Sequence, residues 1–345
     1  MINFLTEFPS IAVFGAFAIS TLLTLACTPA TIKFMKKFHV WQEVRDDGPQ
    51  THLAKQGTPT IGGIAMLIAA DIAILLFRGF SPDAIAMVIA ITLAGVVGFI
   101  DDFLKTVKHQ SLGLNARGKL IGQFLIAIIY VLYAVNISGV LPMVKIPFLF
   151  MLDLGFLYTV FPIFGGLYVP WLYVILVSIL IVGMCNAVNL TDGLDGLAAG
   201  AVCIAMGFMA IIGYKLDYLD SSCVVAAMAG AALGFLWYNC NPAEIFMGDT
   251  GSLMLGMGYG CLAVMTSTEV VSIIVGGLFV IEALSVSLQV LYFRARHKRI
   301  FLMAPLHHHF EKKGWSEIKV CISFWIVAAA FGAFGFLVFF VGHFR

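Results

Sequence analysis

The stretch VCISFWIVAAAFGAFGFLVFFV, from Val320 to Val341, decides the fold of this chain of 345 residues. It holds 22 consecutive residues without a charge. The hydrocarbon core of a bilayer is roughly 30 Å thick, and a helix of about 20 apolar residues spans it. The stretch therefore predicts a membrane-spanning α-helix.

The rest of the chain repeats this pattern. Its mean hydropathy is +1.00 and 11% of its residues are charged, whereas soluble domains carry about 25%, so a water-soluble globule is excluded. We predict an all-α polytopic integral membrane protein, a single transmembrane domain over residues 1–345 with ten transmembrane helices. The ten apolar segments are Ile11–Ile32, Ile61–Phe77, Ala84–Ile100, Leu120–Val140, Trp171–Leu190, Leu197–Gly213, Cys223–Tyr238, Ser252–Met265, Val271–Tyr292 and Val320–Val341.

Lys and Arg residues predict the orientation of these helices. Of the 20 Lys and Arg residues, 16 lie in loops that follow odd-numbered segments and 4 lie on the other side. Cytoplasmic loops carry the excess of Lys and Arg, so the odd-numbered loops are predicted to be cytoplasmic and both termini periplasmic. The formal net charge of +1 gives no reason to expect nucleic-acid binding.

Three features of the apolar regions have open interpretations. Residues 141–170 are interrupted by Pro and Gly and predict either an outward-facing hairpin or an interfacial helix. Asp71 and Glu282 lie inside apolar segments, where an unpaired charge costs about 2.5–3.5 kcal/mol. Each is either a functional group or a structural hydrogen-bonding group.

The pair Asp101 and Asp102 ends the third segment. The helix macrodipole disfavours anions at a helix C-terminus, so these carboxylates need compensation. Lys105 lies on the same helix face, and a divalent cation would compensate them further. The alternative is a solvated, salt-bridged helix end.

A second motif is NAVNLTDGLDGL, from Asn186 to Leu197. Polar residues at a period of three drift around a helix, and the glycines between them predict a helix end, a tight loop and a new helix start. An N-cap role explains one of these polar residues but not all of them. The polar residues are Asn186, Asn189, Asp192 and Asp195.

A third motif is NPAEIFMGDTGS, from Asn241 to Ser252. Asp249 either caps the following helix or binds a metal, and the other acidic motifs favour the metal. Asn239 and Phe246 provide an amide and an aromatic face of the kind that holds a nucleobase, although a Phe in the protein core is the simpler interpretation.

A fourth motif is KQGTPTIGG, from Lys55 to Gly63. A Gly-rich helix start offers free backbone N–H groups to an anion, and Lys55 adds positive charge. Thr58 as N-cap with Pro59 at the first helical position is an ordinary start signal and is compatible with anion binding.

The fifth motif, APLHHHFEKKG, lies in the most basic loop. His307, His308 and His309 are adjacent, so their side chains point in different directions and do not form a zinc site by themselves. Phosphate contact or acid–base chemistry suits them better. Gln289 lies near the inner end of its segment and is expected to reach this cluster.

All five motifs fall on one predicted membrane face. They provide carboxylates for Mg²⁺, cations for phosphates and amides for a base or sugar, which is what phosphoryl transfer requires. A site at the bilayer edge implies one water-borne and one lipid-borne reactant. The predicted active-site loops are about 33–60, 101–119, 185–196, 239–251 and 293–319.

These motifs carry a resemblance to a known family. The strings DDFLK, NAVNLTDGLDG, MGDTGS and APLHHHFEKKGW resemble the signatures of the polyprenyl-phosphate N-acetylhexosamine-1-phosphate transferase superfamily, in order and spacing from about Lys55 to Trp315. Within it, HHHFEKKGW is similar to the loop of the phospho-N-acetylmuramoyl-pentapeptide-transferases. Leu112 stands where the family pattern leads us to expect a basic residue.

The resemblance implies ten transmembrane helices, a homodimer in the bacterial inner membrane and Mg²⁺ as cofactor. It also implies transfer of phospho-MurNAc-pentapeptide from its UDP donor to undecaprenyl phosphate, giving lipid I and UMP. Asp249 would be the metal ligand and Asp101 would face or deprotonate the lipid phosphate. Other implied site residues are Asp102 and Lys105 in support, Asn186, Asn189, Asp192, Asp195 and Phe246 near uridine and diphosphate, and Lys55, Thr60, Lys119, Gln289 and His307 lining the pocket.

Two other functions compete with this interpretation. One is a related enzyme that uses UDP-GlcNAc, and the other is a secondary transporter. A transporter places its acidic residues at broken helices near the bilayer midplane, whereas here they cluster at one surface. Direct attack by the lipid phosphate is favoured over an aspartyl intermediate, because Mg²⁺ and clustered cations reduce the repulsion between two anions.

Overall fold

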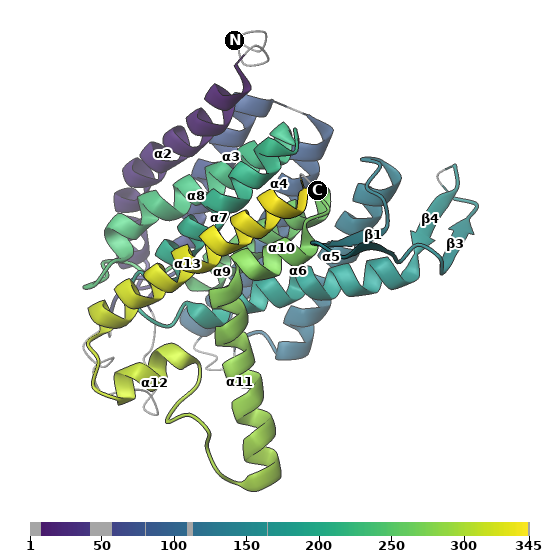
Figure 1. Ribbon diagram of the computed structural model, residues 1–345. Helices are drawn as coiled ribbons and strands as arrows, with labels where there is room; N and C mark the ends of the chain where they lie inside the picture. Colours follow the sequence, from purple (N-terminus) through teal and green to yellow (C-terminus); the bar gives the residue numbers. More distant parts are fainter. Residues whose placement is uncertain (1–7, 42–56, 80, 109–112, 164, 344–345) are drawn as a thin grey trace.

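The computed structural model describes residues 8–41, 57–79, 81–108, 113–163 and 165–343. It is a bundle of helices with two small β-hairpins at one end (Figure 1). The helices are α2 (Pro9–Lys37), α3 (Gly63–Arg78), α4 (Pro82–Thr106), α5 (Ala116–Asn136), α6 (Trp171–Thr191), α7 (Leu197–Lys215), α8 (Leu219–Asn239), α9 (Gly248–Met265), α10 (Glu269–Val275), α11 (Gly277–Arg296), α12 (Leu306–Lys312) and α13 (Glu317–His343). The strands are β1 (Met143–Ile146), β2 (Phe150–Asp153), β3 (Tyr158–Phe161) and β4 (Leu167–Pro170).

Each predicted apolar segment coincides with helix. Within the described residues, 8 helices are long and apolar enough to cross a membrane: α2, α4, α5, α6, α7, α8, α11 and α13. Two further segments form α3, which has 16 residues, and α9. The chain is therefore a polytopic helical membrane protein.

The ninth segment, predicted as one helix over Val271–Tyr292, is broken, so that prediction was wrong. Helix α10 ends before Gly276 and α11 begins at Gly277. Glycine is a poor helix former, and both positions are crowded. A Cβ on Gly276 would lie 2.8 Å from the side chain of Met184, and a Cβ on Gly277 would overlap the ring of Phe331.

A wholly α-helical fold was also wrong, because residues 141–170 form two hairpins. Strands β1 and β2 pair antiparallel with Met143 opposite Asp153, and β3 and β4 pair with Tyr158 opposite Pro170. Of the two forms open for this stretch, the structure has the hairpin. Its prolines lack the N–H that a helix interior needs.

Helix α9 lies at the centre of the bundle. Every residue from Thr250 to Met265 is buried, and α9 contacts α3, α4, α5, α6, α7, α8 and α10. Its glycines allow this packing, since a Cβ on Gly256 would overlap the backbone of Cys185 on α6. The N-terminus of α9 is thereby held rigidly against its neighbours.

The beginning of α2 and the end of α13 lie at the same end of the bundle. Ser10 and Tyr214, near the end of α7, line one apolar surface cavity. Gly342 shares a second cavity of about 220 Å³ with Leu216 and with Lys145 of β1. Because the chain starts and ends its helices at the same end, it crosses the bundle an even number of times. Helix α12 lies at the opposite end (Figure 1).

Candidate active site

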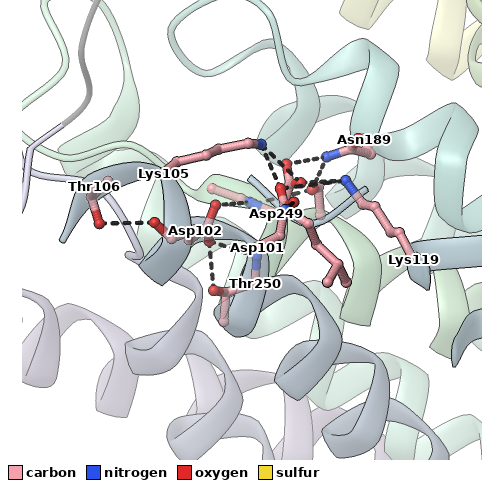
Figure 2. A network of polar contacts seen from close by, with 11 residues as sticks. Asp101, Asp102, Lys105, Thr106, Lys119, Asn189, Asp249 and Thr250 are labelled. Atoms are coloured by element: carbon pink, nitrogen blue, oxygen red, sulfur yellow. Dashed lines mark hydrogen bonds and ion pairs between the residues drawn. The ribbon is translucent and has the colours of Figure 1, made fainter. Parts of the chain in front are cut away.

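Three aspartates meet where the end of α4 touches the start of α9 (Figure 2). One carboxylate oxygen from each of Asp101, Asp102 and Asp249 lies within 4.8 Å of the others. Gly98 permits this approach, because a Cβ there would overlap the backbone of Asp249 and Thr250. Two motifs that are far apart in the sequence thus form one acidic cluster.

Asp102 caps helix α9. Its Oδ1 accepts the backbone N–H of Asp249 at 3.0 Å, and its Oδ2 accepts the backbone N–H and the hydroxyl of Thr250 at 2.9 and 2.6 Å. A carboxylate at a helix N-terminus is stabilised by the free N–H groups and the dipole. The sequence predicted that Asp102 supports catalysis beside Asp101, and the structure shows both of its oxygens binding α9.

Asp249 binds side chains from three other helices. Its Oδ1 accepts the Asn189 amide at 2.7 Å, and that amide also donates to Ser252 Oγ at 2.8 Å. Its Oδ2 pairs with Lys119 and lies 3.3 Å from the Lys105 ammonium. Figure 2 shows both lysines converging on it. The cap on α9 predicted as the alternative role of Asp249 is instead made by Asp102.

Asp101 faces the same two lysines. Its Oδ2 lies 2.5 Å from Lys105 Nζ and 3.7 Å from Lys119 Nζ. Its Oδ1 accepts the backbone N–H of Leu114 at 2.7 Å. Asp101 is buried, so the alternative of a solvated helix end does not describe it.

The second motif forms the predicted helix end, tight turn and helix start. Helix α6 ends at Thr191, Gly196 has a φ of +79°, and α7 begins at Leu197. Of the amides in the motif, Asn189 reaches the acidic cluster. Asn186 instead donates at 2.7 Å to the side-chain oxygen of Gln123 on α5.

The two aspartates of this motif have different surroundings. Burial, together with the nearby charges of Asp249 and Asp102, raises the pKa of Asp192 to about 8. Asp195 links the turn before α7 to two other segments. Its Oδ2 accepts a hydrogen bond from the Asn241 amide at 3.2 Å, and its backbone N–H donates to Glu317, the first residue of α13, at 2.7 Å.

The start of α3 does not offer the free N–H groups predicted for an anion. The backbone N–H groups of Gly62 and Gly63 donate to the carbonyls of Phe246 and Met247 at 2.9 and 3.0 Å. The helix begins at Gly63 with Gly62 as N-cap, so the predicted start at Thr58 was also wrong. The loop instead pairs with the segment that leads into α9.

The remaining predicted residues of these loops have varied surroundings. Thr60 is buried and Phe246 is half-buried. The buried Asn239 amide accepts the Gly196 N–H at 3.1 Å and donates to Ile245 O at 3.0 Å, so the backbone uses both of its ends. Lys55 lies outside the described residues, as does Leu112.

The three adjacent histidines point in different directions, as predicted. His307 is buried and its Nδ1 lies 3.0 Å from Glu282 of α11. His308 Nδ1 lies 2.7 Å from Glu311. His309 Nδ1 accepts the backbone N–H of Leu302 at 3.1 Å, which orders the loop before α12.

Gln289 orders the same loop. Its Oε1 accepts the N–H groups of Ile300 and Phe301 at 3.0 Å each, and its amide donates to Phe301 O at 3.0 Å. The sequence predicted a contact of Gln289 with the polar cluster. The structure instead uses both ends of this amide to hold the loop.

Comparison with known proteins gives the family. The glycosyl transferase family 4 profile matches residues 84–267. A protein of Caldicellulosiruptor bescii is 46% identical over 92% of this chain and 94% of its own length. A protein of Halalkalibacterium halodurans is 42% identical over 91% and 93%, and one of Geobacillus kaustophilus is 40% identical over 96% and 98%. All three are named phospho-N-acetylmuramoyl-pentapeptide-transferase.

The chain belongs to the phospho-N-acetylmuramoyl-pentapeptide-transferase family. It is therefore a phosphoglycosyl transferase, and the resemblance noted on its motifs is confirmed. The interpretation as a secondary transporter is set aside.

The acidic cluster of this transferase fits a divalent metal. Carboxylate oxygens are the ligands that hard cations prefer, and three of them lie within 4.8 Å. The oxygens of Asp102 already accept hydrogen bonds from α9. Asp249 and Asp101 pair mainly with side chains, Asn189, Lys105 and Lys119, rather than with a helix terminus.

Four residues that contact predicted site residues were not themselves predicted as site residues. Thr250 and Ser252 belong to a quoted motif, but their partners on other helices could not be read from it. Gln123 lies one helical turn after Lys119 within an apolar segment. This spacing places both side chains on one face of the helix and could have predicted that Gln123 lies near the site. Glu282 and His307 were both noted, but their pairing was not predicted.

Proposed function

We propose that this chain transfers phospho-MurNAc-pentapeptide from UDP-MurNAc-pentapeptide to undecaprenyl phosphate, giving lipid I and UMP for peptidoglycan synthesis. The observation that carries the proposal is the cluster of Asp101, Asp249, Lys105 and Lys119 where α4, α5 and α9 meet in a chain of this family. Phosphoryl transfer depends on positioning and charge neutralisation, and this cluster combines acidic and basic groups for that purpose.

Each side chain of the cluster has a proposed role. Asp249, with Asp101 beside it, would hold Mg²⁺, which when bound supplies charge neutralisation for the diphosphate. Asn189 orients Asp249 through its 2.7 Å hydrogen bond. Lys105 and Lys119 neutralise the phosphates, and Asp101 faces the lipid phosphate and accepts its proton.

The bond change is a direct displacement. An oxygen of the lipid phosphate attacks the phosphorus that carries the sugar, and the bond from that phosphorus to UMP breaks. The lysines favour this path because they reduce the repulsion between the two anionic reactants. His307 is proposed to contact the UDP-sugar, together with His308, Asn186, Asp192, Asp195 and Phe246. Lys55, Thr60 and His309 are proposed to contribute to the same substrate site, and Asn239 and Gln289 to support it by holding the backbone of its loops.

The protein is proposed to reside in the bacterial inner membrane as a single domain, residues 1–345, with ten transmembrane helices, periplasmic termini and a cytoplasmic active site. The excess of Lys and Arg on the side of the acidic cluster supports this orientation. A homodimer is proposed as the assembly. Its mass in detergent, measured by light scattering, tests that assembly.

The decisive experiment measures UMP release by the purified protein. UDP-MurNAc-pentapeptide and UDP-GlcNAc are compared as donors, each with and without undecaprenyl phosphate and Mg²⁺. We expect UMP from the first donor only, and only when lipid and Mg²⁺ are both present. Faster turnover of UDP-GlcNAc would overturn the donor assignment. Stoichiometric UMP release before lipid is added would overturn direct displacement.

A further inference from the structure

Glu282 and His307 form an isolated pair of ionisable side chains. Glu282 lies on the apolar helix α11 and His307 lies in the first turn of α12. Both are 0% exposed, and Glu282 Oε2 lies 3.0 Å from His307 Nδ1. A carboxylate is retained inside an apolar segment only when it is paired or has a function.

The pair leaves two polar atoms unused. Within the described residues, neither Glu282 Oε1 nor His307 Nε2 has a hydrogen-bond partner, although both atoms are buried. Buried polar atoms in folded proteins are nearly always hydrogen-bonded. The two unpaired atoms of this pair therefore need an explanation.

His307 Nε2 points at the turn between α6 and α7. A Cβ on Gly193 would overlap Nε2, so only glycine leaves room for the imidazole there. Gly193 follows Asp192 and comes four residues after Asn189, which binds Asp249. The Nε2 atom of His307 therefore faces the turn that follows Asn189, the residue that binds Asp249. The other titratable ring packed on His307 is that of His308, at 4.2 Å between centroids.

The contact has two possible forms, because an ionised Glu282 accepts a hydrogen bond from Nδ1–H, whereas a protonated Glu282 donates one to a bare Nδ1. The first form places the hydrogen on Nδ1. We propose that Glu282 is a positioning residue that holds His307 in the Nδ1–H form, so that the unprotonated Nε2 faces the Asp192–Gly193 turn beside the proposed substrate site. The part of this inference that concerns substrate rests on the proposed function, whereas the tautomer does not.

Nitrogen NMR of the substrate-free protein tests the tautomer directly. The protein is labelled with ¹⁵N-histidine, and the His307 signals are assigned by their loss in His307→Asn. We expect a protonated Nδ1 in the native protein and a mixture of both tautomers in Glu282→Gln, because an amide can donate to Nδ1 as well as accept from it. A native His307 protonated at Nε2 alone would overturn the proposal, as would unchanged signals in Glu282→Gln. The native tautomer is read without Glu282→Gln, so it is decided even if that variant does not fold.

Kinetics test whether Glu282 acts through His307. Loss of a carboxylate that orients a functional histidine costs about 10- to 100-fold, so we expect Glu282→Gln to lower kcat by that factor with the KM for lipid within about twofold. In a His307→Ala background the same change should cost less than about twofold. Losses that multiply would overturn the coupling.

Glu269→Gln is the matched control. Glu269 is also a buried carboxylate, with its Oε1 hydrogen-bonded at 3.0 Å to Tyr173 on α6, and it is expected to leave kcat within about twofold. An equal loss in Glu269→Gln would show a general effect of buried charge and overturn the specific role. If the native protein released no UMP, the proposed function would fail while the NMR result still decided the tautomer.

Discussion

At the residue scale, neighbouring side chains of one motif have separate tasks. Asp101 and Asp102 are adjacent in α4, yet Asp101 pairs with two lysines whereas Asp102 binds the first N–H groups of α9. The difference follows from helix geometry, because successive residues point about 100° apart. Substitutions in this pair should therefore separate turnover from stability.

Asp101→Asn is expected to lower turnover by at least about 10²-fold, because the carboxylate that accepts a proton is lost. Asp102→Asn is expected to lower the free energy of unfolding by about 1–3 kcal/mol, because an NH₂ group then faces the N–H donors of α9. UMP release and the Tm of both variants measure the two effects. A larger loss of stability in Asp101→Asn would contradict these assignments.

Asp249→Asn is expected to abolish Mg²⁺-dependent turnover while the protein stays folded. The amide keeps the shape of the side chain but removes the charge that would hold the ion. Turnover is measured over a range of Mg²⁺ concentrations, with Asp217→Asn, on an exposed turn beyond α7, as the control. Native activity in Asp249→Asn would refute its role as metal ligand.

Asp192 should make stability fall as pH rises. Its folded pKa of about 8 lies above the ordinary value of 3.8, so the folded protein keeps a proton that the unfolded chain loses. The stabilisation from that proton is complete below about pH 4 and is lost as pH rises to about 8. Thermal unfolding in EDTA should therefore decline less steeply with pH for Asp192→Asn than for the native protein. Parallel curves would contradict this.

At the element scale, α12 depends on the loop that precedes it. Gln289 on α11 makes three hydrogen bonds to Ile300 and Phe301, and His309 accepts the N–H of Leu302. These contacts hold the loop between two helices, and α12 carries His307 at its start. The element is thus placed by side chains that do not touch the acidic cluster.

Gln289→Leu is expected to lower turnover about tenfold with a small change in Tm, because the loop loses its anchor and His307 its fixed position. Ser287→Ala on the same helix is the control, since its hydroxyl is exposed and donates only to the backbone of Ala283. UMP release and thermal unfolding are measured for both. Equal turnover of the two variants would contradict this role of the loop.

At the scale of the whole molecule, the bundle has two chemically different ends. The hairpins, the start of α2 and the end of α13 lie at one end, and α12 lies at the other (Figure 1). Helix α9, buried along its length, carries Asp249 at its start. The acidic cluster therefore includes the first turn of a helix that is buried from Thr250 to Met265.

Cysteine labelling tests the orientation of the whole molecule. Cysteines are introduced at the exposed Lys313 and Asp217, in a background where the exposed Cys240 is serine. We expect an impermeant reagent added outside spheroplasts to label Asp217→Cys alone, and Lys313→Cys only after lysis. Labelling of both from outside would overturn the proposed topology.

The sequence by itself determined the helical membrane class, the positions of the apolar segments and the motifs that identify the family. These properties are local, because apolar length, Lys and Arg bias and short polar strings can be read within a few tens of residues. The predicted unbroken ninth helix failed because the Gly276–Gly277 break depends on packing against Met184 and Phe331.

Only the tertiary structure decided which polar groups are free for chemistry. Asp102 is used by a helix that begins 146 residues later in the chain, Gln289 by a loop, and Glu282 by His307. A hydrogen-bond partner so distant in sequence leaves no local pattern, and a buried polar group binds whichever donor or acceptor the packing brings to it. For that reason, only the folded protein shows which of the motif residues are available to a substrate and which hold a helix or loop in place.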